Sequence, residues 1–280
     1  KNIYNSIEKY KIFFTRRNLE KINSKINYQN DENLVFLIGF PRSGTTLLDT
    51  ILRTHSKINV LEEKPILLEL RHEFFKERNN NLESLLKITQ KEKDKIRKNY
   101  LDKIDVNLND KNKLIIDKLP LSIIELGFIK SIFPNSKIVL AIRHPCDVTV
   151  SCFFSSFKIN DAMVNFLDWN DTVSFYNEVL TLFEFYEHEL NLKYFEIKYE
   201  NVVNDFQKQI GLLLNFLDLK YESQLEQFHI TAKNRTKIST PSYSQVINPL
   251  YKSSIERWRN YNALVNPESD LKKWIKKFNY

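Results

Sequence analysis

The sequence predicts an α/β protein in which a parallel β-sheet is flanked by helices. Three observations support this prediction. Short apolar runs alternate along the chain with longer segments that carry apolar residues at helical spacing, which is typical of βαβ units. The first apolar run, at 34–39, ends in a glycine-framed turn that leads into a helical pattern. With 280 residues, of which 42% are hydrophobic, the chain is long enough to bury a substantial core.

The expected strands are short apolar runs bounded by polar or turn residues, as buried parallel strands usually are. LVFLIG is the first of them, and KIVLAIR shows the pattern most clearly. The five expected strands span residues 34–39, 57–61, 113–117, 137–143 and 193–200.

Helical spacing of apolar residues predicts the segments between the strands. Residues 1–30 are expected to form a short helical extension, and residues 31–280 the main domain. Pro145 stands near the first turn of one expected helix, a position that proline favours. The other expected helices follow Gly44 or lie within 66–104, 121–133, 161–190 and 201–217, with 77–100 interpreted as a solvated insertion.

Residues 231–261 differ in composition from the rest, with many Ser, Thr, Lys and Arg residues. They predict an ordered loop followed by a helix, and long ordered loops often serve as functional lids.

Composition narrows the possible partners without choosing one. The net charge of +7 is compatible with an anionic ligand and equally with a solvated basic surface. Cys146 and Cys152 suggest no disulfide framework, and no metal-binding spacing occurs, so we expect no metal. No apolar run approaches the ~20 residues of a membrane span, and no stripe of basic and aromatic residues suggests nucleic acid. We therefore expect a cytoplasmic protein without a membrane span.

GFPRSGTT, at 39–46, nearly matches the phosphate-binding P-loop pattern G-x-x-x-x-G-K-[ST]. Thr45 stands where that pattern has lysine. The backbone N–H groups of such a loop and the following helix N-terminus form an anion site, and Arg42 can supply the missing positive charge. No obvious metal ligand of the Walker B kind follows. The loop therefore suits a phosphate group better than a magnesium-bound triphosphate.

A second motif, IRHPCDVTVS, covers 142–151. Arg143 is expected at the end of a strand, and Ser151 two turns into the next helix. The carboxyl ends of parallel strands share one edge of the sheet, which is where ligands bind in such folds. Alone, a strand-end arginine is usually a surface ion-pair residue, so this motif indicates a binding site only in combination with the loop at 39–46.

The two motifs together resemble the sulfotransferases that use 3′-phosphoadenosine-5′-phosphosulfate (PAPS) and release 3′,5′-ADP (PAP). The resemblance spans roughly 34–261 and implies the P-loop-like sulfotransferase fold. It implies that Arg143 and Ser151 bind the 3′-phosphate. It also implies a set of ligands for the 5′-phosphosulfate, namely Arg42, Ser43, Gly44, Thr45 and Thr46.

Further segments are most similar to tyrosylprotein sulfotransferases and bacterial tetratricopeptide-linked sulfotransferases. LEEKP implies that Glu63 is the catalytic base, with Glu62 as a rival, and IIDKLP implies that Lys118 is catalytic. KYEN and the pair SYSQVINP and IERW imply further ligand contacts. These are Tyr199, Ser242 and Arg257.

The resemblance implies an in-line transfer in which Glu63 activates an acceptor while Arg42 and Lys118 stabilise the transferred charge. The acceptor is expected to be a hydroxyl or phenol, a peptide tyrosine, small phenol, sugar or lipid headgroup all being open. Its pocket is expected within 64–80, 155–170 and 235–250. Ser155 departs from the animal enzymes, which have an arginine there. Because tyrosylprotein relatives form dimers, a homodimer is one expected state.

Two other classes of protein remain open at this stage. A P-loop kinase or NTPase would need a lysine at position 45 and would bind Mg-ATP. A non-catalytic nucleotide-binding scaffold would not need the carboxylate and lysine of the EE and K-x-P segments.

Overall fold

The computed structural model describes residues 2–24, 33–105, 113–234, 246–261, 264–265 and 267–280. Within them lies a five-stranded sheet in the order β2-β3-β1-β4-β5, and each neighbouring pair is parallel. The strands are β1 (Leu34–Gly39), β2 (Ile58–Glu62), β3 (Leu114–Lys118), β4 (Lys137–Ile142) and β5 (Phe195–Lys198). The predicted α/β class and all five predicted strands are confirmed.

The central strand β1 explains why the strands are continuous apolar runs. All six of its residues are buried. Leu34, Phe36 and Ile38 belong to one hydrophobic core, whereas Val35 and Leu37 belong to another on the opposite face. Both faces of a parallel sheet are covered in this way, so every position favours an apolar residue.

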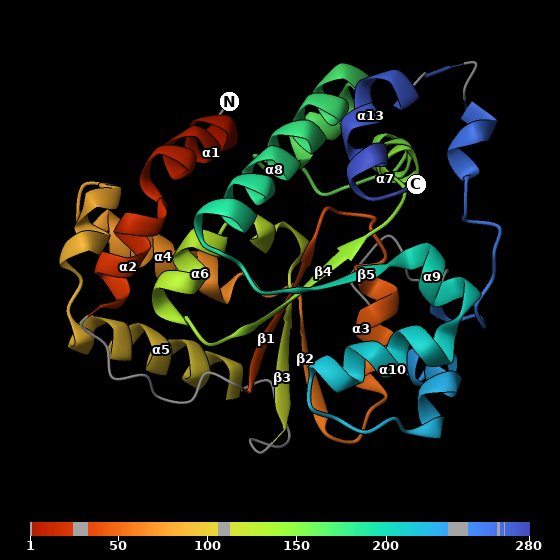
Figure 1. Ribbon diagram of the computed structural model, residues 1–280, viewed down its shortest axis with the longest axis horizontal. Helices are drawn as coiled ribbons and strands as arrows, with labels where there is room; N and C mark the ends of the chain where they lie inside the picture. The colour runs from red at the N-terminus through yellow and green to blue at the C-terminus, as the bar shows by residue number, and fades with distance from the viewer. Residues whose placement is uncertain (1, 25–32, 106–112, 235–245, 262–263, 266) are drawn as a thin grey trace.

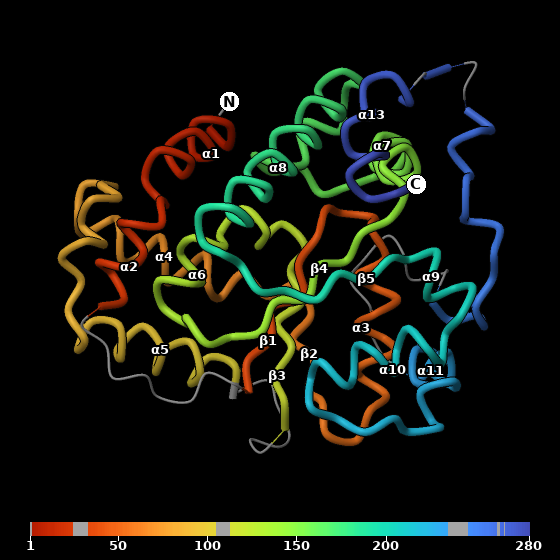
Figure 2. The backbone as a smooth tube through the Cα atoms, in the orientation of Figure 1, coloured from red at the N-terminus to blue at the C-terminus, as the bar shows by residue number. Residues whose placement is uncertain are grey.

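Helices cover both faces of the sheet (Figures 1 and 2). One core is formed with α1 (Asn2–Phe13), α2 (Arg16–Asn23), α4 (Ile66–Lys76), α5 (Gln90–Asp105), α6 (Leu126–Ile132), α7 (Pro145–Phe153), α8 (Trp169–Glu189) and α13 (Pro267–Lys277). The other core is formed with α3 (Thr45–Arg53), α9 (Tyr199–Asn204), α10 (Phe206–Phe216) and α11 (Phe228–Lys233). Short 3-10 helices are η1 (Leu82–Lys87), η2 (Pro120–Ile123), η3 (Met163–Leu167), η4 (Ser223–Gln227) and η5 (Arg257–Tyr261).

Three predicted helices are divided in the structure. The segment 161–190 forms η3 and then α8, because Asp168 caps α8 by accepting from the N–H of Asp171 at 3.0 Å. The segment 121–133 forms η2 and α6, and 201–217 is divided between α9 and α10 at Asp205.

The interpretation of 77–100 as a solvated insertion is wrong. Leu85 and Tyr100 are completely buried in the main core, and the Tyr100 hydroxyl donates to Asp117 at 2.6 Å. Ile96, Tyr100 and Ile104 recur every four residues, so the charged helix α5 has one apolar face.

The first two helices share the core of the main domain. Phe14 is completely buried, and a Cβ at Gly127 would lie 2.3 Å from its ring. Only glycine therefore permits this contact between the amino-terminal segment and α6. The expected boundary at residue 30 lies outside the described residues.

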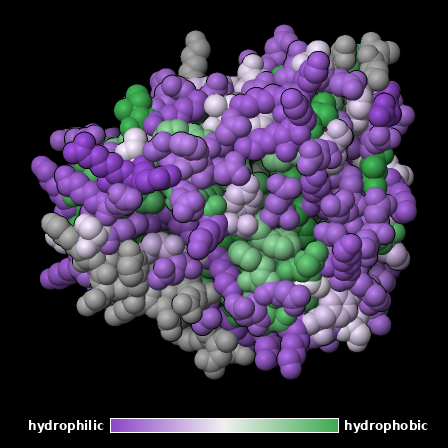
Figure 3. Space-filling model, viewed as in Figure 1, coloured by the Kyte–Doolittle hydropathy of each residue, from purple (hydrophilic) through white to green (hydrophobic). Residues whose placement is uncertain are grey.

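The described surface is largely hydrophilic on the face drawn in Figure 3, as expected for a chain with 28% charged residues. In the part of the chain that the structure describes, no helix is long and apolar enough to cross a membrane.

Candidate active site

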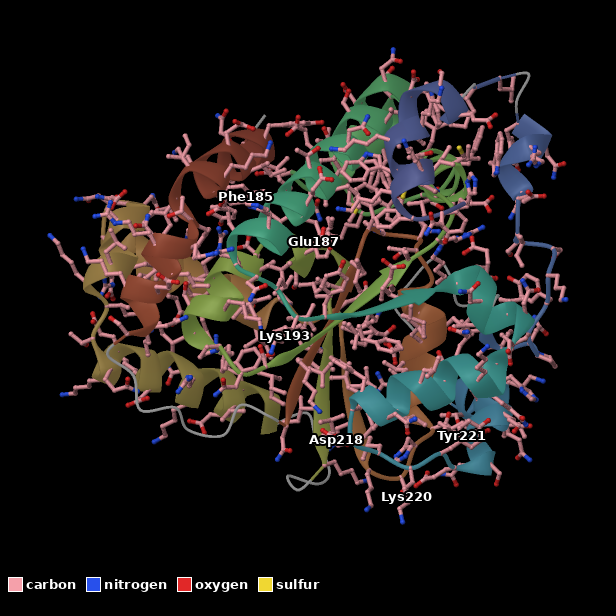
Figure 4. All side chains as sticks on the ribbon, viewed as in Figure 1. Phe185, Glu187, Lys193, Asp218, Lys220 and Tyr221 are labelled. Carbon is pink, nitrogen blue, oxygen red and sulfur yellow. The ribbon has the colours of Figure 1, made fainter. Side chains whose placement is uncertain are left out.

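The predicted site residues gather at the carboxyl ends of the strands. β1 leads into the phosphate loop, β2 into Glu63, β3 ends at Lys118 and β4 leads into Arg143. A large cavity of about 860 Å³ lies at the other edge of the sheet, where the strands begin. Lys193 and Asp218 are part of its lining (Figure 4). Because ligands of such sheets bind at the carboxyl edge, we place the candidate active site there.

The phosphate loop has two residues with left-handed backbone conformation. Gly44, which precedes α3, has φ 95°, and a Cβ there would lie 3.0 Å from the Tyr199 ring. Arg42 has φ 71°, which is unfavourable for a residue with a side chain. Such strain is concentrated at ligand-binding sites, where it holds the backbone in one shape. The loop is thus a preformed turn at the N-terminus of α3, suited to an anion.

Some buried donors at this site lack a hydrogen-bond partner among the described residues. They include the Ser43 hydroxyl and Nε of Arg143. The other nitrogens of the Arg143 guanidinium are hydrogen-bonded within the protein, to the carbonyls of Ser254 at 2.5 Å and Arg42 at 3.4 Å. A buried donor without a partner is costly, so both fit a bound anion.

Arg42 and Ser151, which were expected to bind different phosphates, are in direct contact. Nε of Arg42 donates to the Ser151 hydroxyl at 2.9 Å. Burial lowers the pKa of Arg42, and the neighbouring charge of Arg143 lowers it further. A cavity of about 100 Å³ brings both residues together with Arg143 and Arg257. This small, strongly basic cavity is the best match for the expected 3′-phosphate site.

Tyr199 and Arg257 each line a cavity at the candidate site, whereas Ser242 lies outside the described residues. The Arg143 guanidinium carbon is 5.0 Å from the centre of the Tyr199 ring, a cation–π contact. Tyr199 also lines a neighbouring cavity with Gly44, Thr45 and Thr46. Arg257 is exposed on η5.

Glu63 and Lys118 form an ion pair at the end of β3. Nζ of Lys118 lies 2.7 Å from Glu63, 3.7 Å from Asp49 and 3.8 Å from Glu62. The lysine side chain is completely buried, whereas that of Glu63 is 33% exposed. Glu63 also has a left-handed backbone, φ 48°, fixed by its N–H donating to the Lys118 carbonyl. No motif in the sequence indicated the contribution of Asp49.

A cavity of about 770 Å³ opens beside Glu63. Glu63 lines it together with Arg42, whereas Glu62 is not part of its lining, which favours Glu63 over its rival. The expected walls at 64–80 and 155–170 contribute Leu68, Arg71 and residues 156–158 and 160–163. Two walls were not predicted: residues 119–121 and 124–125, and the first turns of α1, at Asn2, Ile3 and Ser6.

A metal centre has no support in the described part of the chain. No group of three or more His, Cys, Asp and Glu residues there is arranged to hold an ion. His144 has a structural position, because it caps α7 and burial lowers its pKa to about 4.

The sheet and its loop define a P-loop-like α/β protein whose loop lacks the lysine of kinases. The family model described as "Sulfotransferase family" matches residues 34–223, more than half of the chain. The chain therefore belongs to the sulfotransferase family, and the predicted fold and class of enzyme are confirmed.

Individual relatives are consistent with this assignment. The chain is 23% identical over 253 residues to protein-tyrosine sulfotransferase 1 of Danio rerio, covering 87% of this chain and 70% of the relative. It is 27% identical over 245 residues to an uncharacterized protein of Aquifex aeolicus, covering 85% of this chain but only 32% of that protein. Among solved structures, the sulfotransferase domain of the Synechococcus PCC 7002 olefin synthase has the same fold, with a TM-score of 0.63, 19% identity and coverage of 91% and 98%.

Proposed function

We propose that this chain transfers a sulfuryl group from PAPS to a hydroxyl or phenol. The observation that carries the proposal is the position of Arg42. It lines the small basic cavity, the cavity beside Tyr199 and the large cavity beside Glu63. A nucleotide in the first two cavities would therefore present its 5′ end to an acceptor in the third.

PAPS would supply the sulfuryl group and a phosphate leaving group. Its 5′ end fits the preformed loop, where the Ser43 hydroxyl is buried without a partner among the described residues and Gly44, Thr45 and Thr46 form the N-terminus of α3. Its 3′-phosphate fits the basic cavity, where Arg143, Ser151 and Arg257 converge. Tyr199 packs against both Gly44 and Arg143, so it would hold the nucleotide between the two phosphate sites. The role of Ser242 stays a prediction.

Glu63 is the proposed general base. Its carboxylate is partly exposed to the acceptor cavity and is oriented by the hydrogen bond from Lys118. It would take the proton from the acceptor oxygen as that oxygen attacks sulfur. Arg42 and Lys118 would stabilise the negative charge of the transferred group without a metal ion.

The acceptor cavity has apolar walls that suit an aromatic or aliphatic body. They include Leu68, Leu121, Ile124, Phe157 and Met163. Because the Danio rerio relative is named a protein-tyrosine sulfotransferase, we propose a peptide tyrosine as one acceptor. The homodimer and the cytoplasmic location stay predictions of the sequence.

Calorimetric titration with PAP, 5′-AMP and Mg-ATP tests the proposal. We expect PAP to bind without metal and far more tightly than 5′-AMP. Preference for Mg-ATP would instead support the kinase or NTPase alternative, and binding of PAP without any transfer from PAPS would support the scaffold.

A further inference from the structure

Asp147 is a buried carboxylate that holds a distant part of the chain. It lies in the first turn of α7, and its side chain is only 1% exposed. One of its oxygens accepts from the N–H of Glu256 and the other from the N–H of Trp258, each at 2.9 Å. Both donors lie more than a hundred residues further along the chain. We call residues 254–258 the clasp segment.

The clasp segment is shaped to meet this carboxylate. Glu256 has φ 53°, and this left-handed turn accompanies the delivery of two N–H groups to a single side chain. Arg143, one helical turn before Asp147, donates to the carbonyl of Ser254 at 2.5 Å and lies 3.6 Å from the carboxylate. Trp258 then stacks on His144, with ring centres 5.5 Å apart. The segment is therefore fixed at three successive points.

Arg257 lies between the two residues that Asp147 anchors. Its side chain is exposed, and it lines the same cavity as Arg42, Arg143 and Ser151. Asp147 is the only carboxylate among the described lining residues of that cavity, against three arginines. Its two oxygens are, however, committed to the clasp segment, so it serves the cavity by placing Arg257 rather than by contacting an anion.

We propose that Asp147 is a positioning residue, which fixes the clasp segment so that Arg257 becomes a third cationic contact for the 3′-phosphate. This inference rests on the proposed function, because it needs a nucleotide with a 3′-phosphate. It predicts that Asp147 and Arg257 act as a unit in selecting PAP over 5′-AMP.

The test is a double-mutant cycle of Asp147→Asn and Arg257→Ala, with PAP and 5′-AMP affinities measured by calorimetry. Asparagine offers one acceptor oxygen in place of two, so the clasp segment should loosen. We expect each single variant to reduce the preference for PAP over 5′-AMP about tenfold, the loss of one charged hydrogen bond. In the Arg257→Ala background, Asp147→Asn should have no further effect on that preference. A general loss of stability would weaken the binding of both nucleotides equally and leave the preference unchanged.

Arg259→Ala is the matched control, since this arginine is exposed directly after the clasp segment and pairs with Glu256 at 3.0 Å. It should leave the preference unchanged. If Asp147 only neutralises the charge of Arg143, Asp147→Asn will tighten PAP binding, and the proposal is wrong. Additive effects of the two substitutions in the cycle would also overturn the proposal. Should Asp147→Asn fail to fold, an Arg257→Ala variant with an unchanged preference for PAP over 5′-AMP would suffice to reject the proposal. If the wild-type protein shows no preference for PAP, both this inference and the proposed 3′-phosphate site are wrong. If the wild-type protein prefers PAP but the effects of the two substitutions are additive, only this inference is wrong.

Discussion

Replacement of Glu63 by glutamine separates the roles of two adjacent carboxylates. Glutamine keeps an oxygen that can accept from Lys118, which is 2.7 Å from the present carboxylate, but it is no longer a base. A positioned general base contributes about 10²–10⁴-fold to rate, so we expect kcat to fall within about that range. The affinity for PAP should change less than about twofold, because Glu63 is not a predicted nucleotide contact.

The cost to folding should be small enough to leave the kinetic result interpretable. Removing one partner of a buried ion pair costs about 3–5 kcal/mol when the other charge is left alone. Lys118 keeps Asp49 at 3.7 Å and Glu62 at 3.8 Å, and the Glu63 side chain is 33% exposed. We therefore expect a loss of about 1 kcal/mol in the free energy of unfolding, measured with urea.

The assay is transfer from radiolabelled PAPS to a simple phenol, with Glu62→Gln as the matched control. Glu62 has the same chemistry and is near the same lysine, but its side chain is 12% exposed and it does not line the acceptor cavity. It should retain most of the activity. If Glu62→Gln is inactive while Glu63→Gln turns over normally, the assignment of the base is reversed. If PAP binding collapses in Glu63→Gln, the residue belongs to the nucleotide site instead.

Substitutions at four other positions have predictable effects. Arg143→Ala should weaken PAP binding at least about tenfold and leave 5′-AMP binding nearly unchanged, because only PAP carries a 3′-phosphate. Equal losses of affinity for the two nucleotides in calorimetry would contradict the role of Arg143 at the 3′-phosphate. Gly44→Ala should destabilise the fold by about 1–2 kcal/mol, given its φ of 95° and the Tyr199 ring, and should weaken PAP binding. Gly211→Ala, in helix α10 with no atom within 4 Å of the added Cβ, should instead stabilise by about 0.5–1 kcal/mol, and urea unfolding that ranks the two oppositely would refute this. Burial raises the pKa of Asp117 to about 7, so its contribution to stability is full below about pH 4 and is lost as the pH rises through 7. Asp117→Asn should flatten that dependence in urea unfolding at several pH values, and identical slopes for variant and wild type would exclude it.

The strands could be predicted to within two residues because burial on both faces leaves an uninterrupted apolar run in the sequence. Helix ends were less predictable, since they depend on caps such as Asp168, whose role appears only when the donor N–H is known. The strand order could not be derived from these patterns, because it depends on which crossover passes over which face. The misinterpretation of 77–100 came from giving its charge more weight than the four-residue spacing of Ile96, Tyr100 and Ile104.

In the candidate site, residues within a continuous motif could be predicted, whereas contacts across the chain could not. Arg42, Arg143 and Ser151 each belong to a short pattern, and they line one cavity, although Arg42 was expected at the other phosphate. The contact of Asp147 with the clasp segment joins positions over a hundred residues apart, and neither segment contains a pattern that requires the other. The wall formed by α1 was missed for the same reason, because its apolar spacing predicted a helix but not its neighbour.

The missing P-loop lysine is explained by how charge is distributed in this site. A lysine at position 45 would begin α3, where Thr45 is buried and only 3% exposed. In the proposed mechanism, positive charge comes instead from two directions, from Arg42 within the loop and from Lys118 at the end of the strand beside it. Lys118 is fixed by carboxylates, one of which is the proposed base, so charge stabilisation and proton removal are held in one unit. Among the described residues, Arg42 alone lines all three cavities, so in the proposed function its strained backbone would link nucleotide and acceptor.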